Sequence, residues 1–492
     1  MSPRRSVTDT GGMSEPSRGL RPNSLGLAAV VFFVIATVAP MSGTIGALPL
    51  AFGLGSGAGT AASFVVVAVV LILFTLGYMA MGRRIASAGG FYVFIGNGLG
   101  ARAGRAAGYL ALVSYNAFQI AIWGTFGYFC NIFTLDQFGF ELPWVVWVLA
   151  GIAVMGLLGF LNIDVSAKVL GVAVVLEVAM ILVMNFAVVA RGGAGGLGIE
   201  PLTPDAFLSG NPAIGVMFCA LLFIGFEATA IYSEEAREPH RTIPRAAIIA
   251  VLVIAGFYIF TSWSLAMAWG VEDVAAVAAA DPGGFVFGVA AEYLGPWSVS
   301  VMLILFIVST FATNLGFHNA IARYQFSLAR DRWVPRAFER THVRHASPFV
   351  SSLTQTGTAA IVVIAFYLGG AHPYYDMFTW LISLGGLGLI ALMALTSVAI
   401  VVYFARSGSV RRDGIVRTLI APVVAAVALG TEVVLLIANW DLQTVGAGGL
   451  VPFLPLVLLV PLLVGFVLPM RERPAWLPRQ PERDEVVAEE LR

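Results

Sequence analysis

Runs of about twenty apolar residues, the length that crosses the hydrocarbon core of a bilayer, recur along the whole chain. Lipid offers no hydrogen bonds to the backbone, so segments of this kind span a membrane as helices. The sequence therefore predicts an all-α membrane protein, surrounded by the lipid bilayer, with twelve transmembrane helices. The predicted spans are 25–52, 58–82, 106–134, 143–163, 165–190, 212–235, 244–269, 296–328, 349–368, 374–404, 416–438 and 450–468.

The positions of the positive charges support this topology, because Lys and Arg gather in cytoplasmic loops. All of the 28 Lys and Arg residues except Arg191 fall in the two tails, in loops that follow even-numbered spans, or at the span ends that adjoin those loops. We therefore expect a multi-pass plasma-membrane protein whose tails, 1–24 and 469–492, are both cytoplasmic.

Other residue counts argue against several classes of partner. The formal net charge is zero, and the two cysteines, Cys130 and Cys219, both lie inside apolar spans. The five histidines have no metal-ligand spacing. We expect no nucleic-acid partner, no metal site and no cofactor.

The sixth span contains a glycine break followed by a carboxylate. Glu227 follows Phe223-Ile224-Gly225-Phe226 and is the only charged residue between Ala213 and Ser233. A carboxylate at bilayer depth costs roughly 2.5–3.5 kcal/mol on insertion scales, and such residues usually face a protein interior or a wet cavity. Glu227 is therefore predicted to mark a functional site and is a candidate for ion coupling.

The first span has a similar interruption in its middle. Pro40 removes a backbone donor there, and Gly43 and Gly46 loosen the chain. Small residues also serve helix packing, which explains either break alone. Two breaks five spans apart, one beside a carboxylate, instead predict an inverted repeat with substrate between the half-helices. The predicted units are repeat 1 at 25–190, repeat 2 at 212–404 and two peripheral spans at 416–468.

Half-helix ends offer a specific chemistry to a ligand. Freed N–H groups at the start of the second half of span 1 suit a carboxylate, because the positive end of the helix dipole lies there. Freed carbonyl groups at the ends of the first halves suit an ammonium group. Together they predict recognition of an α-amino acid through the backbone.

Residues 223–246 read FIGFEATAIYSEEAREPHRTIPRA and closely resemble the sixth-span signature of the amino acid-polyamine-organocation superfamily. GGFYVFIGNGLG at 89–100 and RYQFSLARDRWVP at 323–335 are similar to that family's loops before span 3 and after span 8. The resemblance covers residues 25–468. It implies the leucine-transporter-like 5+5 inverted repeat, with helices 1 and 6 broken, and alternating access.

The resemblance also implies site residues by position. The carboxylate-binding turn would be Ser42, Gly43 and Thr44, where Thr44 departs from the family by replacing a glycine. In span 6 the resemblance implies that substrate contacts come from Leu221, Leu222, Ile224, Gly225 and Phe226.

Span 3 places polar groups at roughly one-turn spacing. Tyr115, Asn116 and Gln119 fall within an otherwise apolar stretch. They either line the substrate pocket or hydrogen-bond neighbouring helices, and the sequence leaves both interpretations open.

Span 5 contains the most informative departure from the family. Glu177 stands where many proton-coupled members have a buried lysine, and span 8 offers Ser309 and Thr310 near the same region. A carboxylate with hydroxyl groups suits sodium, a hard cation. Alternatively, Glu177 carries the proton itself, since a buried carboxyl group can exchange a proton near neutral pH. A third interpretation is a structural acid that only bonds a neighbouring span.

These observations predict a secondary active transporter that imports an amino acid by proton-coupled alternating access. The alternatives are a transporter of polyamines or other organic cations, a substrate exchanger, and sodium coupling. A membrane-embedded enzyme would need clustered acidic metal ligands or a Ser and His pair at the membrane face, and the sequence presents neither pattern.

Overall fold

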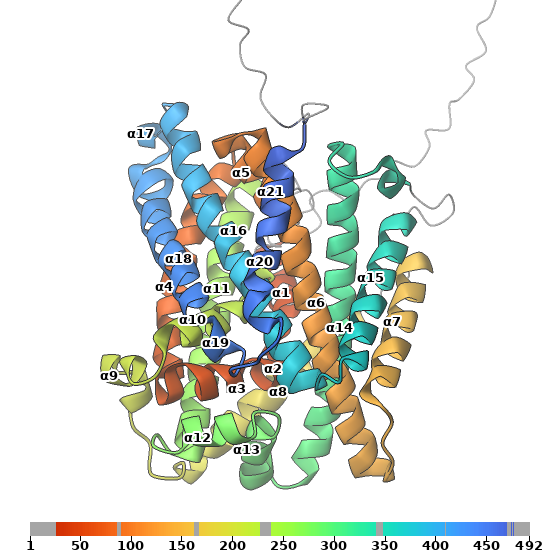
Figure 1. Ribbon diagram of the computed structural model, residues 1–492. Helices are drawn as coiled ribbons and strands as arrows, with labels where there is room; N and C mark the ends of the chain where they lie inside the picture. The colour runs from red at the N-terminus through yellow and green to blue at the C-terminus, as the bar shows by residue number, and fades with distance from the viewer. Residues whose placement is uncertain are drawn as a thin grey trace, which may run out of the picture.

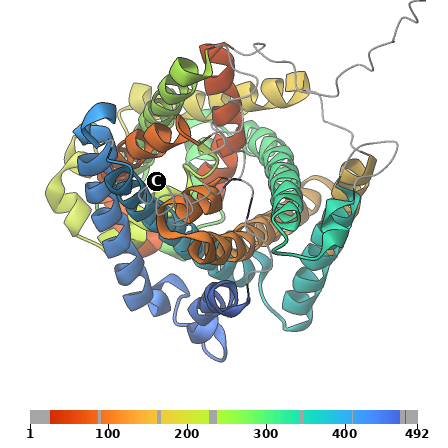
Figure 2. The same ribbon diagram turned by 90° about the horizontal axis from the view of Figure 1, so that it is seen from above.

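The computed structural model describes residues 26–85, 90–161, 167–226, 238–340, 348–408 and 410–469, together with Pro474 and Trp476. All regular secondary structure in these residues is helical. The long helices run side by side along a common axis (Figure 1), and most of them are seen end-on after a quarter turn (Figure 2). The all-α class predicted from the apolar runs is confirmed.

Each predicted span contains at least one helix, and several bounds agree closely. The ninth predicted span, 349–368, matches α15 at both ends. The principal helices are α1 (Leu27–Val38), α2 (Pro40–Gly46), α4 (Thr60–Gly82), α6 (Ala101–Phe138), α7 (Trp144–Leu161), α8 (Ala167–Arg191), α10 (Pro212–Leu221), α11 (Pro239–Trp269), α14 (Trp297–Arg330), α15 (Phe349–Leu368), α16 (Thr379–Arg406), α18 (Ala421–Ala438) and α21 (Leu459–Val467).

Eight helical segments of the described chain are long and apolar enough to cross a membrane, or nine if α12 (Val274–Ala280) and α13 (Phe285–Leu294), bent by 117°, form one span. Shorter apolar helices occur at Trp144–Leu158, Pro212–Leu221 and Val451–Val467. These lengths fit a multi-pass membrane protein. The count of twelve remains a prediction.

Short helices join the long ones and cap both ends of the bundle. In Figure 1, α5 and α17 lie at the upper end, whereas α9, α12 and α13 lie at the lower end. The remaining short elements are α3 (Leu48–Leu50), η1 (Ala51–Ser56), η2 (Gly57–Gly59), α5 (Phe91–Leu99), η3 (Glu200–Leu202), α9 (Pro204–Leu208), η5 (Arg336–Glu339), η6 (Pro373–Phe378), α17 (Val410–Asp413), η7 (Val416–Ile420), α19 (Trp440–Gln443), η8 (Val451–Phe453) and α20 (Leu454–Val457).

The long helices follow a similar order in the two predicted repeats. A helix that ends early, α1 or α10, opens each repeat, and four longer helices follow it. Those are α4, α6, α7 and α8 in the first repeat and α11, α14, α15 and α16 in the second. This order is compatible with the 5+5 arrangement, which remains a prediction.

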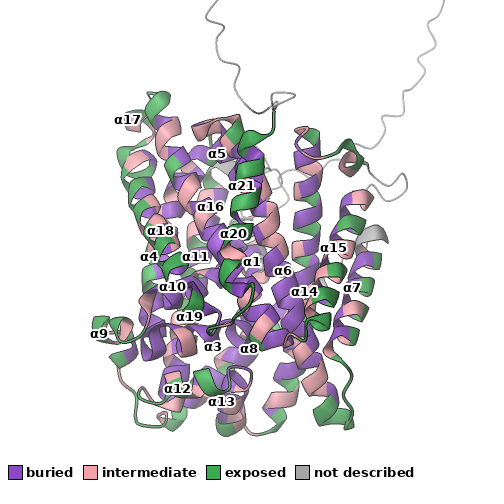
Figure 3. Cartoon of the chain, in the orientation of Figure 1, coloured by how far each residue is buried: buried purple, intermediate pink, exposed green. Residues whose placement is uncertain are grey.

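Large apolar side chains are exposed on the outer faces of the peripheral helices. Val172 and Phe186 of α8 are 60% and 61% exposed, and Val427 and Val434 of α18 are each 64% exposed. Figure 3 shows buried residues concentrated inside the bundle and exposed ones on its outer helices. A surface of this kind is stable against lipid rather than water.

A buried arginine fixes the end of the last helix. Arg105 of α6 is 3% exposed and donates to the carbonyl oxygens of Gly465 (2.8 Å), Pro469 (3.2 Å) and Leu468. The last carbonyl groups of a helix have no partner within it. Arg105 therefore binds α21 to α6 by satisfying them.

One tryptophan beyond the last helix packs onto the same end of the bundle. The Trp476 indole N–H donates to Asp331 Oδ2 (2.9 Å), which also accepts the Tyr92 hydroxyl (3.0 Å). A Cβ at Gly96 would meet the far edge of the Trp476 ring, so the glycine leaves room for the ring to lie against α5. Burial raises the pKa of the Asp331 carboxyl, and the bonds from Trp476 and Tyr92 partly oppose that rise.

Candidate substrate and ion site

Helix 1 breaks three residues before the predicted turn. Ala39 separates α1 from α2 and has left-handed dihedrals, φ 49° and ψ 74°. The following Pro40 explains the break, since proline lacks an N–H and disfavours helical conformation in the preceding residue. The expectation that 42–44 form the broken turn is therefore wrong: all three residues are helical within α2.

One side chain of the half-helix α2 hydrogen-bonds to the backbone of the same helix. The Thr44 hydroxyl is buried and donates to the Pro40 carbonyl oxygen at 2.8 Å. It therefore satisfies a group of its own helix. Ser42 and Gly43, which precede it, are both half-buried.

The described part of helix 6 ends at the predicted break. α10 ends at Leu221, and the next residues make short-range bonds, from Leu222 N to Cys219 O and from Ile224 N to Leu221 O. Gly225 has φ 112°, a conformation that favours glycine. The residue that drew attention to this break, Glu227, lies outside the described residues.

The two breaks face each other across a close contact. A Cβ added to Gly43 would lie 2.5 Å from Tyr258 Oη and 3.0 Å from Leu222 Cγ. Tyr258 lies on α11, and its hydroxyl donates to Pro40 O at 3.4 Å. Gly43 therefore admits both neighbours because it has no side chain. Sequence reasoning missed Tyr258, because an aromatic residue within an apolar span carries no distinguishing signal.

The predicted contact residues of span 6 divide between two sides of the break. Leu222 faces α2, whereas Leu221 faces α16, where a Cβ at Gly386 would lie 2.6 Å from its Cδ2. Leu221, Ile224 and Phe226 line a cavity of about 20 Å³ together with residues of α4, α16 and α18. That volume holds about one water molecule, so an amino acid would have to enlarge it.

Glu177 joins three helices. Its carboxylate accepts the Ser309 hydroxyl of α14 (Oγ to Oε2, 2.9 Å) and the backbone N–H of Met41 in α2, and its own Cα lies on α8. The side chain is 2% exposed. The three salt bridges found among the described residues do not include Glu177.

The second predicted hydroxyl is bonded elsewhere. Thr310 Oγ1 donates to the carbonyl oxygens of Phe306 and Ile307, both at 3.0 Å, within its own helix. The structure thus brings Ser309 to Glu177 and leaves the Thr310 hydroxyl in helix bonding. Within the described parts of the chain, no three His, Cys, Asp or Glu residues are grouped as metal ligands would be.

The polar residues of span 3 contact neighbouring helices. Gln355 of α15 donates through Nε2 to Asn116 Oδ1 (2.8 Å) and to Gln119 Oε1 (2.6 Å). Tyr115 packs near the rings of Phe317 and Tyr324 on α14, each with centroids 6.2 Å away. Of the two alternatives for Asn116, the contacts fit the bond between helices. The partner Gln355 was missed, although it is polar within a predicted span.

Comparison with known proteins identifies the family. The sequence model described as amino acid permease matches residues 25–464. The chain belongs to the amino acid permease family. The resemblance to the amino acid-polyamine-organocation superfamily is thereby confirmed. The chain is a permease and not an enzyme.

Individual relatives are named for different substrates. The chain is 26% identical over 365 residues to the branched-chain amino acid permease BcaP of Bacillus subtilis (strain 168), covering 70% of this chain and 74% of the relative. It is 26% identical over 360 residues to the low-affinity putrescine importer PlaP of Escherichia coli (strain K12), covering 70% and 75%. A shorter match, 29% over 212 residues, joins it to the lysine-specific permease LysP of Lactococcus lactis subsp. cremoris (strain MG1363), covering 42% and 39%.

Proposed function

We propose that this permease imports an amino acid across the plasma membrane by proton-coupled alternating access. The observation that carries the coupling is the position of Glu177, a buried carboxylate that bonds both to α14 and to the half-helix at the break of helix 1. Substrate would lie between the two breaks. The relatives that act on amino acids support this choice of substrate class.

The position of the two breaks supports a site made mainly from backbone. Ser42 lies in the first turn of α2, where N–H groups have no carbonyl partner within the helix, whereas the Gly43 N–H donates to Ala39 O at 3.2 Å. Leu222 approaches Gly43 from the other break. A substrate carboxylate would approach the α2 end and an ammonium group the carbonyl groups that follow α10, with Ile224 and Phe226 on the substrate's apolar side.

The surroundings of Glu177 favour uptake of a cation. An ionised carboxylate is expensive to bury unless a positive charge accompanies it. The described contacts of Glu177 are a hydroxyl and a backbone N–H, both neutral. A proton or a metal cation would remove the uncompensated charge, and its release on the opposite side would couple transport to the gradient.

The same contacts favour a proton over sodium. Sodium takes oxygen ligands, and Ser309 supplies one hydroxyl oxygen beside the carboxylate. The Met41 backbone supplies an N–H donor, which cannot ligate a metal ion. Thr310, the second predicted ligand, is bonded within its own helix.

A polyamine or other organic cation is the alternative substrate, favoured by the relative named as a putrescine importer. Such a substrate needs carboxylates open to the path. Glu177 is 2% exposed and already bonded, which makes it a poor partner for a soluble amine. A polyamine substrate would therefore have to pair with Glu227, the other acid predicted near the transport path.

Uptake into proteoliposomes tests the proposal. Purified protein would be given labelled leucine, lysine or putrescine under a proton gradient alone and under a sodium gradient alone. We expect accumulation of one of the amino acids under the proton gradient. Glu177→Gln, which preserves shape but cannot release a proton, should exchange substrate across the membrane yet lose accumulation and its pH dependence.

Glu432 supplies the matched control. It is a second buried acid, on α18, and lies 9% exposed. Glu432→Gln removes the same ionisable group from a helix outside the predicted repeats and should accumulate substrate as before. Unchanged accumulation by Glu177→Gln under both gradients would refute the role of Glu177. If Glu177→Gln instead lost stimulation by sodium and kept its pH response, the coupling ion would be sodium rather than a proton.

A further inference from the structure

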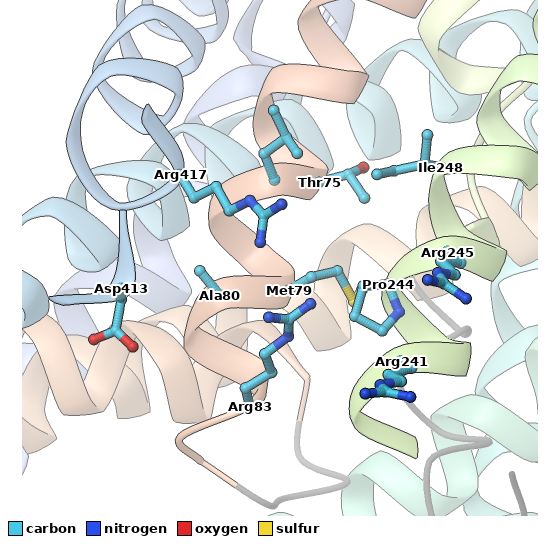
Figure 4. Close-up of a pocket in the computed structure, with 11 residues that line it drawn as sticks. Thr75, Met79, Ala80, Arg83, Arg241, Pro244, Arg245, Ile248, Asp413 and Arg417 are labelled. Atoms are coloured by element: carbon cyan, nitrogen blue, oxygen red, sulfur yellow. The ribbon is translucent and has the colours of Figure 1, made fainter. Parts of the chain in front are cut away.

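A second site lies beside α17, which is labelled at the upper end of the bundle in Figure 1, away from the two helix breaks. A pocket of about 260 Å³ lies between the end of α4, the start of α11 and η7. Its inner wall is apolar and includes Leu76, Met79 and Ile248. Figure 4 shows arginine side chains approaching this space from three elements.

The pocket is strongly basic. Arg83 follows α4, Arg417 lies on η7, and Arg241 and Arg245 lie on the first turns of α11. All four side chains are exposed at its mouth. Four guanidinium groups around one cavity form a site for a polyanion, because each presents paired N–H donors that match phosphate oxygens.

The nearby acids of the described chain do not neutralise the pocket. Asp413 lines its edge but is held by Arg84, whose Nη2 lies 2.6 Å from Oδ2 and 2.9 Å from Oδ1. Glu238 lies 3.6 Å from Arg241, and both side chains are more than 70% exposed, so water weakens this pair.

Apolar side chains on the outer surface extend from the pocket along the bundle. Leu252 lies one helical turn from Ile248 on α11 and is 52% exposed. Ile420 lies three residues beyond Arg417 and is 48% exposed. Residues at this spacing share a helix face. The basic pocket is therefore continuous with a lipid-facing surface on both of its walls.

We propose that this pocket binds the phosphate headgroup of an anionic phospholipid, whose acyl chains lie along the exposed faces of α11 and η7. Basic pockets between transmembrane helices bind lipid phosphates in this manner. A soluble phosphate ion shares the headgroup chemistry but has no use for the apolar surface below. The site touches neither Gly43 nor Glu177, so the inference is independent of the proposed transport mechanism.

Lipid titration of the full-length protein in detergent tests the proposal. Short-chain phosphatidylglycerol, phosphatidylcholine of the same chain length, and inorganic phosphate would each be titrated and bound molecules counted by native mass spectrometry. We expect phosphatidylglycerol to bind more tightly than phosphatidylcholine. The double variant R245Q/R417Q should weaken it by about 25-fold, since one arginine near a lipid surface contributes about fivefold.

R336Q/R340Q is the matched control. It removes two exposed arginines of the chain between α14 and α15, outside the pocket, and should bind phosphatidylglycerol like the unmodified protein. Four results would overturn the proposal, and the first three are binding results. They are equal binding of the two lipids, equal loss in the two double variants, and inorganic phosphate binding as tightly as phosphatidylglycerol. A fourth is a fall in thermal stability of R245Q/R417Q without loss of lipid, which would give the arginines an intramolecular role.

Discussion

Replacing Gly43 by alanine tests whether the two helix breaks pack against each other as described. The new Cβ would meet Tyr258 Oη at 2.5 Å and Leu222 Cγ at 3.0 Å. Tyr258 cannot swing away freely, because its side chain is fully buried and its ring stacks on Phe64 with centroids 5.1 Å apart. The alanine variant should therefore be overpacked at this point.

The size of the effect follows from the contact distances. Tyr258 Oη must move by about 0.9 Å to reach 3.4 Å, where ordinary contact begins. Forcing an extra carbon into a packed core typically costs about 1–3 kcal/mol. Tyr258→Phe removes the obstructing oxygen, and the ring carbons lie no closer than the 3.4 Å of the third nearest atom. The alanine should therefore cost at least about 1 kcal/mol less in the phenylalanine background.

A double-mutant cycle measures this difference. The free energy of unfolding in mixed micelles would be determined for the unmodified protein, G43A, Y258F and the double variant. Y258F alone should cost about 0.5 kcal/mol, the low end for a hydrogen bond, because its bond to Pro40 O is long at 3.4 Å. An equal cost of G43A in both backgrounds would mean that Gly43 does not face Tyr258, and the packing of the two breaks would be refuted.

Three further changes have defined outcomes. Gly225→Ala should cost about 1–3 kcal/mol in unfolding measurements, since φ 112° strains any side chain there, and an unchanged stability would contradict the break. Gln355→Met should lower the free energy of unfolding by about 1–3 kcal/mol for each of Asn116 and Gln119 left without its donor; a smaller total would mean that water replaces the amide. Burial raises the pKa of the Asp331 carboxyl in the folded protein, so folding favours the protonated acid. The stability that the protonated acid provides at low pH is lost as the pH rises from the ordinary aspartate pKa through the raised pKa of the folded protein. Asp331→Asn should therefore gain thermal stability over the unmodified protein as the pH rises, and a constant difference across a pH series would contradict this.

The span positions were predictable because bilayer thickness fixes their length and the apolar runs show it directly. The predicted spans 349–368 and 416–438 agree with helical segments of the structure at both ends. The break of helix 6 was predictable for a related reason, since Gly225 interrupts an otherwise helical pattern and only glycine adopts its conformation without strain.

The break of helix 1 was predicted near 42–44, within an interruption that also contains Pro40, whereas the chain breaks at Ala39. Glycine permits a break without requiring one, whereas proline lacks the N–H that helix bonding needs. Pro40 therefore determines the position, and Ala39 adopts the left-handed conformation. Gly43 serves close packing instead, which no local pattern reveals, because its neighbour Tyr258 lies 215 residues further along the chain.

The hydrogen-bond partners of buried polar residues could not be predicted from the sequence either, because these partners also lie far away along the chain. The polarity of Glu177 marked it as a candidate, but whether it meets Ser309 or Thr310 depends on the rotation of α14 about its axis. Asn116 was likewise recognisable as polar, and its bond to Gln355 on α15 follows only from which helices are adjacent. Sequence patterns identify buried polar groups, and the packing of helices chooses their partners.

The hydrogen bonds of Arg105 have a consequence for biogenesis. Its acceptors lie at least 360 residues further along the chain, which corresponds to roughly 20–70 seconds of translation at ~5–20 residues per second. During that interval the guanidinium has none of these carbonyl groups and must be hydrated or meet lipid phosphate. Docking of α21 is therefore a late step of assembly, and a ribosome that stops before Gly465 releases a chain whose third span still exposes an unmatched cation to cellular quality control.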